Sequence, residues 1–330
     1  MNRYHLVHTT EFLYDGPVSE SYNEVRLRPL QDEKQSCLSF RLTTNPGSRG
    51  TAYRDAHGNW VHQFNVLREH RHLKVEAESV VLAHEGSEFP ADATTLAEFD
   101  ANRGKLSEEY FDLLAPSAYV PHLEELREFI GAAEKDAGGT VAGFARAASD
   151  VIHSGLRYVK GATHVHSSIK DSLSVGAGVC QDFAHVLLGV VRMRGIPGRY
   201  VSGYLVPRSA VSPEAKQENV IGGHASHAWT EVLMPGGNWM ALDPTFGKPV
   251  GLRHIRVAYG RDYGDVAPVR GVYKGQAGQR LCVDVRVRPA LDDAGREQLN
   301  ESCSPPVATP IVERPHQPAP QQQQQQQQQQ

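Results

Sequence analysis

Apolar and polar residues alternate with a period of two along the first part of the chain. Leu38, Phe40 and Leu42 alternate with small or polar neighbours, and residues 73–77 repeat the pattern. Such alternation is typical of half-buried strands, and turn-forming Gly, Pro and Asn residues separate the runs. Several short strands at this spacing predict an antiparallel β-sandwich over residues 1–85.

A helical period replaces the alternation in the middle of the chain. Residues 86–120 are weakly patterned and are interpreted as a connector. Helices are predicted after Pro121, where the chain has a favoured first-turn residue, and over residues 141–152. The clearest helix covers residues 183–191, where apolar residues recur at i, i+3, i+4, i+7 and i+8.

Strand patterns return after this helix. They cover residues 199–206, 227–234 and 239–243, with a hairpin turn between the last two, and residues 281–287 alternate again. Helices followed by antiparallel strands predict an α+β domain over residues 121–295. Residues 296–330 are rich in Pro and end in ten Gln, which predicts a disordered tail.

Composition narrows the class of protein. The formal net charge is -4 and 22% of residues are charged, which argues against a nucleic-acid partner. The first residues lack the apolar run of a signal peptide, and no stretch is long and apolar enough for a membrane helix. We therefore expect a cytoplasmic protein that binds neither membrane nor nucleic acid. The four cysteines have no short spacing between them, so each is expected to be a free thiol.

One of these cysteines lies in a setting that suits a nucleophile. Cys180 follows Gly176-Ala-Gly-Val and immediately precedes the clearest helix. Glycines allow a sharp backbone turn, so the thiol is delivered to the helix N-terminus, where free N–H groups and the helix dipole favour a thiolate. The alternative is a buried cysteine that packs as a small apolar residue.

A histidine and an aspartate lie on the two strands of the predicted hairpin. His227 begins the first strand and Asp243 ends the second. Folding the strands about the turn places the two residues on nearly opposite rungs, where opposed Cβ atoms are about 4.5–5.5 Å apart. At this separation a carboxylate can orient an imidazole and stabilise its protonated form. Either residue alone would be read as a surface histidine or a turn-forming aspartate.

These residues and their surroundings resemble the transglutaminase-like superfamily. More narrowly, the chain is similar to bacterial transglutaminase-like proteins with an N-terminal β domain, over roughly residues 3–290. The motifs that match are Gly178-Val-Cys-Gln-Asp-Phe-Ala-His185, Arg199-Tyr-Val-Ser-Gly-Tyr204, Ser226-His-Ala-Trp229, Gly260-Arg-Asp-Tyr263 and, in the β domain, Tyr53-Arg-Asp-Ala-His-Gly-Asn-Trp60.

The resemblance implies a papain-like α+β core with Cys180, His227 and Asp243 as a catalytic triad. It also implies attack on a peptide or protein amide, a Cys180 thioester, and transfer of the acyl group to an amine or water. The Cys180 backbone N–H is a plausible oxyanion donor, with Gln181 and Trp229 as candidates for a second. No cofactor is implied.

Two further readings of the site stay open. Tyr204 and Trp229 either line the acyl cleft or are core aromatics. The histidines at 164, 166, 224 and 227 raise the question of a metal site, but both close pairs lie in or near expected loops and no HExxH motif is present, so no metal is expected.

Three functions remain. The first is an acyltransferase between amides and amines, the second a cysteine peptidase or amidase that uses water, and the third a non-catalytic binding module. The intact Cys-His-Asp set disfavours the third. The oligomeric state does not follow from the sequence.

Overall fold

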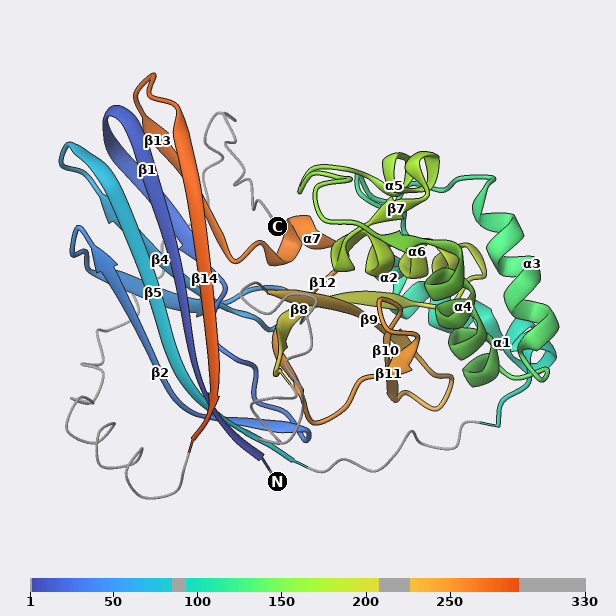
Figure 1. Ribbon diagram of the computed structural model, residues 1–330. Helices are drawn as coiled ribbons and strands as arrows, with labels where there is room; N and C mark the ends of the chain where they lie inside the picture. Colours follow the sequence, from blue (N-terminus) through green and yellow to red (C-terminus); the bar gives the residue numbers. More distant parts are fainter. Residues whose placement is uncertain (1, 85–92, 208–225, 291–330) are drawn as a thin grey trace. The chain divides into compact units, whose positions relative to one another are not determined.

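A computed structural model describes residues 2–84, 93–207 and 226–290 of the protein (Figure 1). Contacts divide these residues into two compact units. The first contains residues 2–84, 206–207 and 268–290, and the second contains residues 93–205 and 226–267. Each described helix is too short or too polar to cross a membrane.

The first unit is an antiparallel seven-stranded sheet organised around its longest strand, β1. The early part of β1 pairs with β5 and β14, and its later part, beyond an irregularity after Leu13, pairs with β4 and β13. The order is β2-β5-β1-β4-β3. The strands are β1 (Asn2–Val25), β2 (Gln35–Asn45), β3 (Gly50–Arg54), β4 (Trp60–Val66), β5 (His70–Ala83), β13 (Val269–Lys274) and β14 (Gln279–Pro289).

This unit confirms the predicted N-terminal antiparallel β region. Its long strand β1 joins two groups of strands, with β2, β5 and β14 along its early part and β3, β4 and β13 along its later part. Residues 269–289 were placed in the catalytic domain of residues 121–295, yet β13 and β14 pair with β1. Alternation identifies a strand but says nothing of a partner more than 200 residues away.

The second unit has the expected α+β composition. Its five-stranded sheet has the order β11-β10-β9-β8-β12, and β6 and β7 form a separate parallel pair. Its helices are α1 (Leu96–Glu109), α2 (Phe111–Leu114), α3 (Leu126–Asp136), α4 (Val141–Gly155), α5 (Ile169–Val175), α6 (Cys180–Met193) and α7 (Tyr263–Val266). Its strands are β6 (Arg157–Tyr158), β7 (Ala177–Gly178), β8 (Gly198–Leu205), β9 (His227–Leu233), β10 (Trp239–Asp243), β11 (Lys248–Pro249) and β12 (His254–Gly260).

Part of the expected connector is helical. The helix α1 begins at a capping box in which Thr95 accepts a hydrogen bond from the Glu98 backbone N–H and the Glu98 carboxylate accepts one from the Thr95 N–H. This capping box is a recognisable start signal. The helix was missed because its residues show little apolar periodicity.

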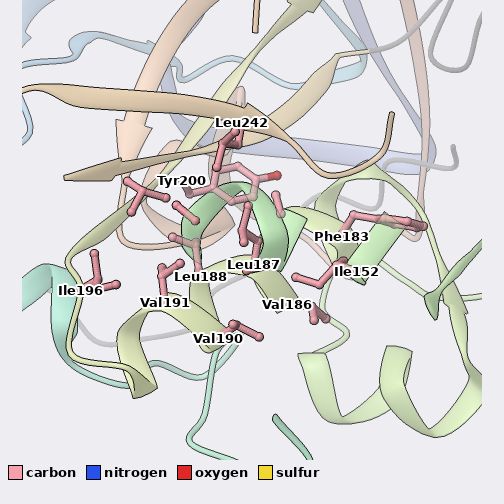
Figure 2. Close-up of a cluster of buried hydrophobic side chains, with 14 of the residues drawn as sticks. Ile152, Phe183, Val186, Leu187, Leu188, Val190, Val191, Ile196, Tyr200 and Leu242 are labelled. Carbon is pink, nitrogen blue, oxygen red and sulfur yellow. The ribbon is translucent and has the colours of Figure 1, made fainter. Parts of the chain in front are cut away.

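The core of the second unit is built around α6. Its residues from Cys180 to Arg192 are all buried, and Figure 2 shows Phe183, Leu187 and Val191 among the packed side chains. The helix packs on β8 and β9 and on α3 and α4. Burying each large aliphatic side chain contributes roughly 1.5–3 kcal/mol, so this packing fixes where the helix begins.

Candidate active site

Cys180 is the first residue of α6 and is 3% exposed. The turn that delivers it is held by Asp182, whose carboxylate accepts hydrogen bonds from the Val179 N–H at 2.8 Å and from the Thr163 hydroxyl at 2.6 Å. A Cβ on Gly178 would lie 2.6 Å from that of Asp182, so the close approach requires glycine. The sequence therefore places the thiol at the helix N-terminus, where the dipole favours negative charge.

His227 and Asp243 are brought together and are both buried. The His227 Nε2 lies 2.7 Å from Asp243 Oδ2, and the Thr245 backbone N–H donates to Asp243 Oδ1 at 3.0 Å. The two residues lie near one another but are not directly opposite. Leu242 pairs with Thr230, which places Asp243 two residues from the position opposite His227, so the Asp243 side chain reaches His227 along a diagonal.

The second nitrogen of His227 is left for the thiol. Nε2 is engaged by Asp243, and Nδ1 is buried without a hydrogen bond of standard geometry among the described residues. Burial lowers the pKa of His227, but the Asp243 charge, its hydrogen bond and the Cys180 thiol together raise it to about 10. The imidazole is thus poised to be protonated at neutral pH.

Asp243 stays ionised despite its burial. Burial acts to raise the pKa of its carboxyl, but the charge and hydrogen bond of His227 and the hydrogen bond of His254 hold it well below the usual range. The carboxylate therefore carries the compensating negative charge for an imidazolium.

His254 is a site residue that the sequence did not reveal. It begins β12, and its Nε2 lies 3.0 Å from the same Asp243 Oδ2 that binds His227. The strand-end position of His254 resembles that of His227, but no local motif links it to Asp243. Of the histidines considered for a metal site, His164 is exposed, and His224 lies outside the described residues.

Ligand atoms of His227, Asp243 and His254 lie within 4.8 Å of one another, as a metal site would require. However, the Gly251 backbone N–H donates to His254 Nδ1 at 3.2 Å. A neutral imidazole that accepts at Nδ1 carries its proton on Nε2. The His254 Nε2 is therefore a hydrogen-bond donor to Asp243, which does not suit a metal ligand.

The other expected site residues are buried. Trp229 is fully buried beside Val201 and Ala241, its ring meets that of His254 edge-on at 5.2 Å, and its Nε1 has no hydrogen-bond partner among the described residues. Tyr204, on β8, is 3% exposed. Roles for both in substrate binding stay predictions. The Gln181 amide donates to the Val165 carbonyl at 3.1 Å.

A negative charge on Cys180 would act on two tyrosines that sequence reasoning did not single out. Burial, followed by the negative charge that Cys180 can carry, raises the pKa of Tyr158 and of Tyr200. Both hydroxyls keep their protons and can act as donors. Tyr158 is half-buried on β6, pairs with Gly178 and has its ring 6.4 Å from that of Phe183.

Comparison with known proteins gives matches for both units. Residues 4–82 match the model of the bacterial transglutaminase-like N-terminal region, and residues 129–244 match that of the transglutaminase-like superfamily. The chain is 35% identical to the uncharacterized protein ML0607 of Mycobacterium leprae over 87% of this chain and 99% of that protein. It is 32% identical to the uncharacterized protein Rv2569c of Mycobacterium tuberculosis over 89% of this chain and 95% of that protein.

One solved structure is similar over nearly the whole chain. It is that of the "Putative Cysteine Protease" from Cytophaga hutchinsonii, with a TM-score of 0.63 and 21% identity over 89% of this chain and 92% of that one. At this identity the likeness establishes a shared fold.

Proposed function

Because the chain belongs to the transglutaminase-like superfamily and has its bacterial N-terminal region, we propose that it is a thiol enzyme that processes peptide or protein amides through a Cys180 thioester. One observation carries the proposal. His227 offers Nε2 to a buried carboxylate at 2.7 Å and keeps Nδ1 for a thiol at a helix start.

The chemistry follows from the protonation states of these groups. The Cys180 thiolate attacks the amide carbonyl carbon, and the carbonyl oxygen becomes an oxyanion to which the Cys180 backbone N–H can donate. Protonated His227 gives its proton to the leaving nitrogen, the C–N bond breaks, and a thioester and an amine result. Neutral His227 then takes a proton from the incoming amine or water, and the thiolate is released when the acyl group transfers.

Asp243 supports both half-reactions without itself taking up a proton. It fixes His227 with the Nε2 proton toward the carboxylate and stabilises the imidazolium that alternates with the neutral ring. The half-buried Tyr158 hydroxyl is a candidate second donor to the oxyanion, since it keeps its proton and its strand pairs with Gly178, two residues before Cys180.

The nucleophile is tested by Cys180→Ala in the full-length protein. We expect this variant to lose turnover of a casein or glutamine-peptide substrate while its far-UV circular dichroism and thermal midpoint match the parent. Cys282→Ala is the matched control because Cys282 is an exposed thiol on β14. Unchanged turnover in Cys180→Ala would disprove the nucleophile assignment.

Water as the acceptor is the second candidate. The fold shared with the Cytophaga hutchinsonii protein supports this alternative, because that protein is named for proteolysis. Incubating the substrate with and without a primary amine such as monodansylcadaverine separates the two. Amine-dependent acyl-amine product supports transfer, whereas free acid in equal amounts in both reactions supports hydrolysis.

A further inference from the structure

Asp243 accepts hydrogen bonds from two imidazoles through one oxygen. His227 approaches Oδ2 from β9 at 2.7 Å and His254 approaches it from β12 at 3.0 Å. The side chains of Asp243 and His254 are 1% and 9% exposed. Water is therefore largely kept from this carboxylate, and its charge depends on the protein groups around it.

The second imidazole is fixed as a donor by the backbone. Since Gly251 N–H occupies the lone pair at His254 Nδ1, the proton of the neutral ring lies on Nε2 and points at Asp243. The other tautomer would set two N–H groups against each other at Gly251, and a ring flip would replace the accepting Nδ1 with a carbon, so the tautomer and the orientation are specified together.

Burial, assisted by nearby positive charges, keeps His254 neutral. Burial lowers its pKa, and the nearby His227 and Arg253 act in the same direction, while Asp243 opposes them through its charge and hydrogen bond. The ring therefore donates to the carboxylate without adding a positive charge that would compete with a protonated His227.

We propose that His254 is a positioning residue that holds Asp243 as a carboxylate and fixes Oδ2 toward His227, extending the triad to Cys180, His227, Asp243 and His254. This inference rests on the proposed thiol chemistry. Without His254, the buried Oδ2 keeps a single side-chain partner and is held less firmly toward His227. The hydrogen bond that stabilises the imidazolium then weakens, and the thiolate beside it becomes less stable.

The test is the pH dependence of Cys180 alkylation by iodoacetamide in the full-length protein, measured by mass spectrometry of the Cys180 peptide. This reaction reports the thiolate and needs no known substrate. The acid limb is the pH range in which the alkylation rate falls as the thiolate becomes protonated. In His254→Phe this limb is expected to move to higher pH by roughly one to two units, the scale of a lost hydrogen bond to a charged group. His254→Asn should shift it likewise, because its shorter amide does not reach Asp243.

His254→Gln is the rescue variant. Its longer amide can accept from Gly251 and donate to Asp243, so its acid limb should stay within a few tenths of a pH unit of the parent. His122→Phe is the matched control, since His122 is exposed. Thermal unfolding of each variant identifies any that fail to fold.

The outcomes separate this inference from the proposed function. A wild-type acid limb at the value of a free thiol, about 8.5, would contradict the activated thiolate itself. If the wild-type acid limb lies below that value but His254→Phe and His254→Asn leave it unchanged, the role of His254 is overturned. A shift in His254→Gln equal to that in His254→Phe would overturn it as well. Protection of Cys180 by Zn²⁺ in the wild type but not in His254→Phe would replace the hydrogen bond with a metal site.

Discussion

The two faces of the five-stranded sheet differ in chemistry. The face against α6 carries Tyr200, Val232 and Leu242, which belong to the main apolar core. The alternate residues of the same strands include His227, Glu231 and Asp243, which are also buried but charged or titratable. One face thus supplies apolar packing to the core around α6. The other combines a small apolar cluster around Trp229 with buried ionic groups in defined geometry.

Glu231 shows how the polar face is kept in order. Its carboxylate accepts hydrogen bonds from Arg199 Nε at 2.9 Å and from Arg256 Nε at 2.8 Å. The Arg199 guanidinium also stacks on Tyr259 and Trp239, 3.7 Å and 4.0 Å from the ring centres. These contacts come from four strands, so the cluster fixes strand positions as well as charges.

The largest effect on activity is expected from substitutions on the polar face of the sheet. His227→Ala should lower kcat/KM by about 10⁴-fold or more, because neither half-reaction then has a proton carrier. Asp243→Asn should cost less if Asp243 only orients and stabilises His227. Steady-state kinetics with a common substrate measure both. An equal or larger loss in Asp243→Asn would mean a more direct role for the carboxylate.

The largest effect on stability is expected from the ionic cluster. Glu231→Gln leaves Arg256, which is 5% exposed, without its carboxylate partner. Breaking a buried pair in this way costs about 3–5 kcal/mol of unfolding free energy. Urea denaturation followed by fluorescence measures the change. A loss below about 1 kcal/mol would place the cluster with ordinary surface pairs.

The apolar face should respond in stability alone. Leu187→Ala removes a fully buried side chain from α6 and should cost about 2–5 kcal/mol. Activity per folded molecule should stay near the parent value, because Leu187 lies two turns from Cys180. Denaturation and active-site titration of the same sample provide the check. A large fall in activity of the folded fraction would show that core packing also sets the thiol geometry.

The paired groups should make stability depend on pH. The pKa of His227 is raised to about 10 in the folded protein, so its contribution is complete below about 6.5 and is lost as pH rises toward 10. The loss is on the order of a few kcal/mol. The free energy of unfolding of Cys180→Ala, measured between pH 6 and 10, isolates the part of the pH dependence that comes from the His227–Asp243 pair. In His227→Gln the pH dependence of the free energy of unfolding should be flat over this range. Asp243, whose pKa is lowered, acts oppositely, and its contribution is lost only as pH falls below about 4.

The smallest effect is expected at Tyr158. Tyr158→Phe keeps the ring beside Phe183 but removes the hydroxyl. If this hydroxyl donates to the oxyanion, kcat should fall by about 10–100-fold with little change in KM, the scale of one hydrogen bond to a charged group. An unaltered kcat would rule out the Tyr158 hydroxyl and leave the Cys180 backbone N–H as the donor to the oxyanion.

Local patterns predicted the parts of the fold that local forces determine. Residues 183–191 read as a buried helix because one apolar face repeats through it, and α6 lies there. The proximity of His227 to Asp243 followed from a short hairpin. The diagonal register did not, because it depends on where the turn closes. His254 was missed because its partner lies on a strand that is not its neighbour in the sheet.

The pairing of β13 and β14 with β1 has a consequence for biosynthesis. The strand β1 is synthesised long before its partners β13 and β14. The residues of the second unit are synthesised between β5 and β13 and can fold before the sheet is complete. Until then β1 exposes the edges that β13 and β14 later cover, and such open edges pair readily with other chains. Nascent chains arrested before residue 268 should therefore depend on chaperones more than the finished protein does.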